Sequence, residues 1–181
     1  MGTIKKHPPV QLFMAVTFNP VLPIEDILAK IEQTFGPIED KTSVFDFDAF
    51  TDYYEKEMGK GLKKFFVTFY DLIEPEDFPE IKVRSNQLEK EISGQDKRKV
   101  NIDPGYLNLS KVVLATTKDY SHRLYLGQGI FGDLHLVFIN KTFRQQPWTY
   151  PDYQQDWVIA FFNRLRTTYR EKLGEYLSQA I

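Results

Sequence analysis

An uninterrupted apolar run near the start of the chain constrains the fold more than any other feature. Residues 10–18, VQLFMAVTF, combine β-branched and aromatic side chains without the polar alternation of a half-exposed strand. Such a run predicts a strand that is buried on both faces. A similar run at residues 63–73, KKFFVTFYDLI, predicts a second buried strand. We therefore expect both strands to be central in one mainly antiparallel sheet.

The segments around these strands alternate between helical and extended patterns. Apolar residues recur at helical spacing over residues 24–35, and in a thinner stripe over residues 81–92. Residues 43–50, SVFDFDAF, alternate as in a half-buried strand, and Asp103-Pro104-Gly105 predicts a turn before a strand that ends near Thr117. The order strand, helix, strand, strand, helix, strand predicts an α+β fold with a ferredoxin-like βαββαβ core.

The last third of the chain predicts two additions to this core. The strings HRLYL and DLHLVFI indicate a β-hairpin with a five-residue loop at residues 128–132. Pro151 is suited to the first turn of a long C-terminal helix. The apolar stripe of that helix comprises Val158, Phe161, Phe162, Leu165, Tyr169 and Leu173. The polar stretch 93–99 reads as a surface loop rather than a linker, so we expect a single domain over residues 1–181.

Composition and charge exclude several functions. The chain has 23 Lys and Arg against 25 Asp and Glu, so its net charge of −2 offers no broad positive field, and we expect nucleic-acid binding to be unlikely. With no cysteine, it has no disulfide, thiolate nucleophile or Cys-ligated metal. No signal-peptide pattern and no apolar run of membrane-spanning length are present, so we expect a cytoplasmic protein without membrane contact.

Several strings resemble those of a family of uncharacterised bacterial proteins of about this length: TDYYEKEMG, NIDPGYL, KVVLATTK, HRLYLGQGI and TYPDY. The resemblance covers nearly the whole chain and implies one module, but the family has no established activity. Some members carry the label GTP-binding protein. The residues here do not support a standard GTPase, because Gly59, Lys60 and Gly61 have neither the spacing nor the Ser or Thr of a phosphate-binding loop.

The predicted hairpin provides the main candidate site. If its leucines share one face, Leu124 lies opposite Leu136 and Leu126 opposite Leu134. The other face then brings four polar side chains together: Arg123, Tyr125, Asp133 and His135. We predict ligand binding by Arg123 and Tyr125, and proton transfer by a catalytic pair, His135 and Asp133, with Arg123 and His135 partly exposed in the absence of ligand. The alternative is an ordinary cross-strand network that stabilises the sheet.

Two further clusters of polar residues are candidates for a binding site. Lys118 and His122 concentrate donors beside Arg123, where a phosphate or carboxylate would bind, and we include both as ligand-binding candidates. Asp46 and Asp48 could bind magnesium, but alternating Asp residues are typical of a solvent-facing strand, so we expect no metal site.

These observations favour a small-molecule-binding domain for an anionic ligand, which is phosphorylated, nucleotide-like or carboxylated, with or without enzymatic activity. One alternative is an RNA-binding module, because the element order and KGLKKFFVTF are similar to an RNA-recognition motif. Another is a non-catalytic protein-interaction module. The sequence leaves the identity of any cofactor, any protein partner and the oligomeric state unknown.

Overall fold

The computed structural model describes residues 2–94 and 97–179. Their strands form one antiparallel sheet in the order β2-β4-β1-β5-β6-β8-β7, with β3 beside β4 and β9 beside β8. The strands are β1 (Val10–Phe18), β2 (Ile38–Lys41), β3 (Phe45–Asp46), β4 (Lys63–Ile73), β5 (Val100–Leu107), β6 (Lys111–Thr116), β7 (Arg123–Gly127), β8 (Ile130–Ile139) and β9 (Thr142–Gln145). The helices are α1 (Ile24–Phe35), α2 (Glu55–Met58), α3 (Phe78–Ser93) and α4 (Asp156–Gln179), with short 3-10 turns η1 (Pro75–Asp77) and η2 (Pro151–Gln154).

The two apolar runs form the centre of the sheet, as predicted. Strand β1 pairs with β4 on one side and β5 on the other, and all of its residues are buried. Phe65 and Phe66 of β4 are fully buried on opposite faces, one in each of two apolar cores. The mixed α+β architecture with an antiparallel sheet is therefore confirmed.

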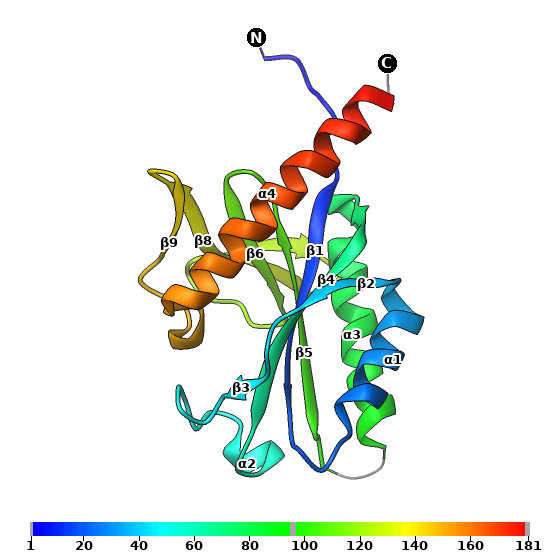
Figure 1. The fold of residues 1–181 in the computed structure, drawn as a ribbon, viewed down its shortest axis with the longest axis vertical. Coiled ribbons are helices and arrows are strands. Elements are labelled where there is room, and N and C mark those ends of the chain that lie inside the picture. The colour runs from blue at the N-terminus through cyan, green and yellow to red at the C-terminus, as the bar shows by residue number, and fades with distance from the viewer. Residues whose placement is uncertain (1, 95–96, 180–181) are drawn as a thin grey trace.

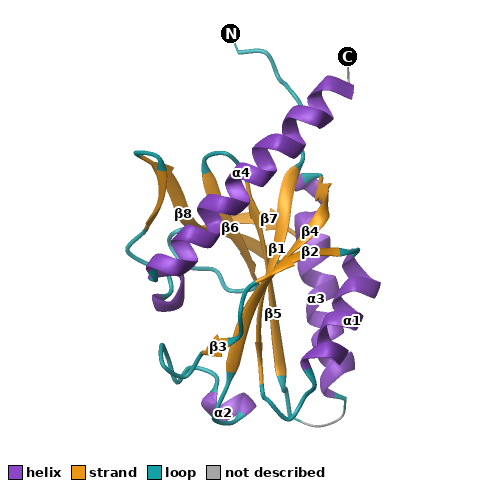
Figure 2. Ribbon diagram, in the orientation of Figure 1, coloured by secondary structure: helices purple, strands orange, loops and turns teal. Residues whose placement is uncertain are grey.

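Helices cover both faces of this sheet (Figures 1 and 2). Ile27 and Ile31 of α1 pack with Ile81 and Leu88 of α3 in the core on one face. Helix α4 crosses the other face, and its predicted apolar stripe is buried there against Phe13 and other sheet residues. The long C-terminal helix and the burial of its apolar stripe are confirmed. Its predicted start is wrong, because Pro151 begins the 3-10 turn η2 and the helix begins at Asp156.

The predicted strand over residues 43–50 is largely wrong. Only Phe45 and Asp46 pair with β4, whereas the unpredicted strand β2 takes the adjacent edge position. Phe45 packs against Trp157 on the α4 side, while Phe47 belongs to a separate cluster with Met58. The alternating phenylalanines therefore serve two small packing sites instead of one continuous strand face.

The predicted turn at residues 103–105 is also wrong, because β5 passes through it as an extended strand. Gly105 is required by close packing: a Cβ there would lie 2.2 Å from the ring of Phe13. Pro104 has no N–H to donate, and β5 pairs with β6 only from Gly105 to Leu107. The residues of β5 from Val100 to Pro104 therefore have no partners on β6.

The hairpin exists, but its predicted register and loop are wrong. Gln128 and Gly129, with φ of 55° and 74°, form a two-residue turn, which places Arg123 opposite Asp133 and Tyr125 opposite Phe131. A further irregularity between β6 and β8 puts Leu134 and Leu136 in different apolar clusters, so the leucines do not share one face. A bulge breaks the alternation on which the predicted register depended.

Two other expectations concern the loop at residues 93–99 and contact with a membrane. The predicted loop at 93–99 includes residues 95 and 96, which lie outside the described residues. Across the part of the chain that the structure describes, no helix has both the length and the apolar character required to cross a membrane.

Candidate functional site

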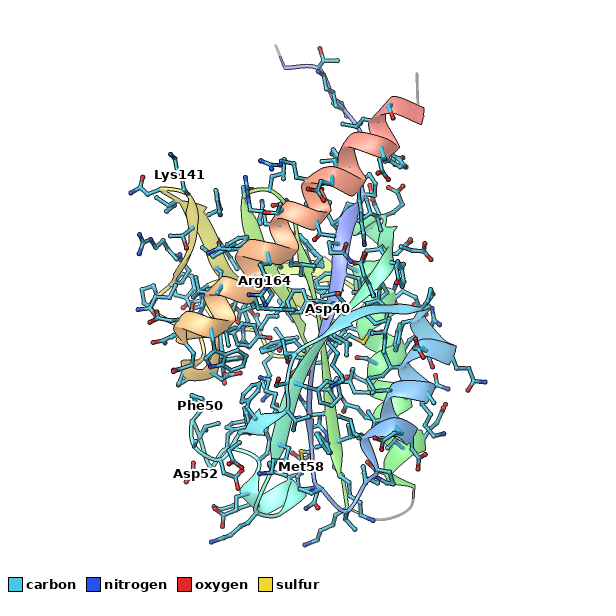
Figure 3. All side chains as sticks on the ribbon, viewed as in Figure 1. Asp40, Phe50, Asp52, Met58, Lys141 and Arg164 are labelled. Atoms are coloured by element: carbon cyan, nitrogen blue, oxygen red, sulfur yellow. The ribbon has the colours of Figure 1, made fainter. Side chains whose placement is uncertain are left out.

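Two adjoining hollows open beside the unpaired part of β5 and β6. Their volumes are about 560 Å³ and 260 Å³. Six residues line both: Tyr53, Tyr54, Asp103, Leu114, Lys118 and Tyr150. We call the combined depression the tyrosine cleft. Phe50, which lines the smaller hollow, lies on the loop between β3 and α2, close to the segment that precedes α4 (Figure 3).

A buried ion pair lies beside the smaller hollow. The Nζ of Lys64 on β4 lies 2.6 Å from the Oδ2 of Asp152 on η2, and both side chains are at most 6% exposed. The same Nζ lies 5.0 Å from the ring centroids of both Phe47 and Tyr153. Aromatic rings therefore surround an ammonium group that has one carboxylate partner.

Asp103 lies at the junction of the two hollows. Its carboxylate accepts hydrogen bonds from the Nζ of Lys82 at 3.0 Å and from the Nδ2 of Asn101 at 2.6 Å. Burial opposes the charged form of Asp103, but Lys82 and the hydrogen bond from Asn101 outweigh it and lower its pKa. Asp103 is thus a carboxylate at neutral pH.

The larger hollow has a second paired cation at its wall. Arg98 donates to Glu89 at 2.6 Å, and the backbone N–H of Ile102 donates to the other oxygen of Glu89 at 2.7 Å. Burial nevertheless raises the pKa of Glu89 above its ordinary value. Arg98 and Lys82 are therefore both held by local carboxylates.

A closed hydrogen-bond network fixes Tyr150. The Tyr150 N–H donates to Nε2 of His135 at 3.1 Å, so Nδ1 is the nitrogen that carries the proton toward Asp133, at 3.3 Å. Arg123 donates from Nε to Asp133 at 2.9 Å and from Nη2 to the Tyr150 hydroxyl at 3.3 Å. Burial lowers the pKa of His135 despite Asp133, which keeps the imidazole neutral.

Three tyrosine hydroxyls of the cleft, those of Tyr54, Tyr150 and Tyr153, stay protonated at neutral pH because their pKa values are raised. Burial raises the pKa of Tyr150 to about 12, and it raises the pKa values of Tyr54 and Tyr153 as well. The hydroxyl of Tyr153 is buried and has no hydrogen-bond partner within the described part of the chain. The cleft thus offers neutral O–H donors beside several fixed charges.

Residues 8–169 match the model of a family described as a domain of unknown function, DUF4416. The chain belongs to this family. Its match spans the whole cleft lining, from Thr17 to Tyr153. No curated protein and no solved structure matches this DUF4416 domain.

The structure places three of the predicted site residues at the cleft of this DUF4416 domain. Lys118 lines both hollows, Arg123 lines the smaller one and Asp133 the larger one. The expected partial exposure of Arg123 and His135 is wrong, because they are 8% and 0% exposed. Both are buried in the network that holds Tyr150, and His135 lines neither hollow.

The other two predicted residues lie outside the cleft lining. His122 stacks on Trp148 with ring centroids 4.5 Å apart, and its Nε2 lies 3.4 Å from Asp133 without hydrogen-bond geometry. Tyr125 is 63% exposed, and its hydroxyl accepts from the Gly129 N–H beside the hairpin turn. His122 therefore joins Arg123 and His135 around Asp133, whereas Tyr125 is separate.

Sequence reasoning missed most of the cleft of the DUF4416 domain. The residues not selected from the sequence include Tyr53, Tyr54, Lys64, Lys82, Arg98, Asp103, Tyr150, Asp152 and Tyr153. One signal was present: all five strings that carry the family resemblance, TDYYEKEMG, NIDPGYL, KVVLATTK, HRLYLGQGI and TYPDY, contribute residues to the cleft. Because these strings are far apart in the sequence, local patterns gave no indication that they lie together in the fold.

Proposed function

We propose that this domain binds a small anionic ligand in the tyrosine cleft, with the acidic group of the ligand at Lys118. The observation that carries the proposal is the state of the cations at the smaller hollow. Lys64 is paired with Asp152 and Arg123 with Asp133. The Lys118 ammonium instead contacts the hydroxyl and ring of Tyr53, and no carboxylate of the described residues lies within 4.0 Å of it.

The position of Lys118 suits an entering anion. It lines both hollows, and its Nζ lies 4.7 Å from the ring centroid of Tyr53, which is itself 62% exposed. Arg123 adds its guanidinium nearby, because it lines the smaller hollow and donates to the backbone oxygen of Lys118. An anion at this point would receive charge-assisted hydrogen bonds from Lys118 and Arg123.

We assign His135 and Asp133 a positioning role at this site. His135 holds the backbone of Tyr150, and Asp133 holds the Arg123 side chain that reaches the Tyr150 hydroxyl. Because His135 has no exposed surface, a ligand in either hollow would meet Tyr150 and Arg123 first. Any catalytic proton transfer would then involve a cleft hydroxyl or carboxylate rather than the imidazole.

An NMR titration with inorganic phosphate and with acetate tests the proposal. We expect saturable shifts of the amide signals around Lys118, and their loss in Lys118→Ala. Lys118→Arg should retain binding because it keeps the positive charge. The matched control is Lys111→Ala, which removes a lysine from the other end of β6, outside both hollows. Equal titration of the Lys118→Ala and wild-type proteins would refute this site.

The structure offers little support for the RNA-binding alternative. The sequence argument required aromatic side chains of β4 to be available for stacking, but Phe65 and Phe66 are both fully buried. A protein-interaction role has one supporting feature, since edge strand β7 exposes Leu124, Tyr125 and Leu126. Sedimentation of wild type and Leu124→Glu tests self-association, and identical monomeric profiles would remove that form of the alternative.

We also propose a ferredoxin-like classification for the βαββαβ part of the fold. The supporting observation is the order β2-β4-β1-β5 within the larger sheet, with α1 following β1 and α3 following β4. The remaining strands extend this unit beyond β5. The proposal is tested by an experimental structure of the domain, in which a different strand order would exclude the classification.

A further inference from the structure

The ammonium group of Lys64 has more N–H donors than hydrogen-bond partners within the described structure. A lysine ammonium carries three N–H groups, and the one hydrogen-bond partner of Lys64 in the described structure is the Asp152 carboxylate. The side chain is 6% exposed and lines the smaller hollow. A buried N–H group without a hydrogen-bond partner destabilises the folded protein. A hydrogen-bond acceptor that binds in the hollow would therefore be stabilised by these unused N–H groups.

The Tyr153 hydroxyl provides an independent observation. It is buried without a hydrogen-bond partner among the described residues, although Tyr153 is one of the residues that line the same hollow. The Tyr153 ring stacks on the ring of Phe162 in the apolar core, with the two ring centroids 5.8 Å apart.

We propose that the smaller hollow is a subsite for a planar ring that bears a hydroxyl or carbonyl oxygen, which accepts hydrogen bonds from Lys64 and Tyr153. The acidic group of the same ligand lies at Lys118, so this inference rests on the proposed function. It narrows the ligand class to small aromatic or heteroaromatic acids with an oxygen substituent on the ring.

The shape of the subsite favours a ring. Its walls include Phe47, Phe50, Tyr54 and Tyr150, and aromatic rings pack well against the faces and edges of other aromatic rings. Its volume of about 260 Å³ is close to the lower end of ordinary ligand pockets, about 300 Å³. One substituted ring fits this space better than a larger ligand.

The charges of the subsite favour a neutral oxygen at its inner end. Asp152 already neutralises Lys64, and Asp103 adds a second carboxylate to the lining. A second anionic group beside these carboxylates would be repelled, whereas a hydroxyl or carbonyl oxygen accepts hydrogen bonds without adding charge. The acidic group of the ligand therefore belongs at the Lys118 end.

NMR titrations with para-hydroxybenzoate and benzoate test the subsite, because the two probes differ only in the ring hydroxyl. We expect the wild-type protein to bind para-hydroxybenzoate about tenfold more tightly, the ratio that corresponds to one hydrogen bond to a charged donor. Tyr153→Phe should reduce this preference several-fold while leaving benzoate affinity and the melting temperature unchanged, because the hydroxyl that it removes has no partner in the protein.

A second variant tests Lys64 without leaving a buried charge. The double substitution Lys64→Met with Asp152→Leu removes both members of the ion pair and should abolish the preference for para-hydroxybenzoate. Lys118→Ala should instead weaken both probes equally, and Lys111→Ala should change neither.

The outcomes separate the subsite from the proposed function. If both probes bind equally to wild type and depend on Lys118, the subsite is refuted and the anion site stands. If phosphate binds at Lys118 but neither aromatic probe does, only the subsite is refuted. If phosphate and both aromatic probes fail to bind, or if their binding is independent of Lys118, the proposed function fails and the subsite with it. A Tyr153→Phe variant that loses both probes together with thermal stability shows a packing role and overturns the inference.

Discussion

Removal of the Asp152 carboxylate should destabilise the protein strongly. The Asp152→Ala substitution leaves the Lys64 ammonium 6% exposed among aromatic rings, without the oxygen that lies 2.6 Å from it. Breaking a buried ion pair in this way destabilises proteins by about 3–5 kcal/mol. For a domain of this size, each kcal/mol lowers the melting temperature by about 2–4 °C, so we expect a decrease on the order of 10 °C.

The assay is urea unfolding followed by circular dichroism, with a thermal melt of each variant. The matched control is the neighbouring bridge between Lys63 and Asp46, whose side chains are 37% and 65% exposed. Asp46→Ala should change the free energy of unfolding by about 1 kcal/mol or less, because water solvates both partners. The double variant Lys64→Met with Asp152→Leu should recover most of the loss, because it leaves no buried charge.

Two results would refute this reasoning. If Asp152→Ala costs no more than Asp46→Ala, water reaches Lys64 and the site is not desolvated. If the double variant is as unstable as Asp152→Ala, the loss comes from packing around η2 rather than from an uncompensated ammonium. Either result would also weaken the case for free donors at the inner end of the cleft.

Three further predictions concern the core, the last helix and the network around Tyr150. Phe66→Ala, at a fully buried position, should lower the free energy of unfolding by about 3–5 kcal/mol in urea titrations. A fragment that ends before Pro151 should show no cooperative melt by calorimetry, because it lacks the helix that covers one sheet face. Burial lowers the pKa of His135, so its neutral ring contributes stability that is complete above the unfolded pKa of about 6.5 and is lost as the pH falls through the lower folded pKa. The melting temperature should therefore decrease from pH 7 to pH 5, and decrease less in His135→Gln, which stays neutral over this range.

The elements that the sequence predicted well are those with long, regular apolar patterns. Strands β1 and β4 are apolar on both faces, and α4 has an apolar stripe over several turns. Their burial alone decides their place in the fold. Strand β2 was missed because its residues, IEDK, lie at a sheet edge and carry no apolar pattern.

The candidate site was predicted less well because it depends on departures from regular structure. The cleft opens where Pro104 lies within β5, a residue that the sequence rules assign to a turn. The irregularity in β8 places His135 in the core, although strict alternation predicted a partly exposed face. A bulge or a strand-internal proline depends on tertiary packing, which local patterns do not contain.

The charge pattern of the cleft explains how a chain with a net charge of −2 could hold an anion. Lys64, Lys82, Arg98 and Arg123 each lie within 4.0 Å of a carboxylate, so these cations are fixed without creating a strong positive field. Lys118 has an aromatic partner in place of a carboxylate, and its attraction for an anion is therefore not cancelled locally. The net charge of the chain counts both kinds of cation equally, so it does not reveal this difference. For this reason our proposal places the anion at Lys118, which lines both hollows and has Tyr53 as its neighbour.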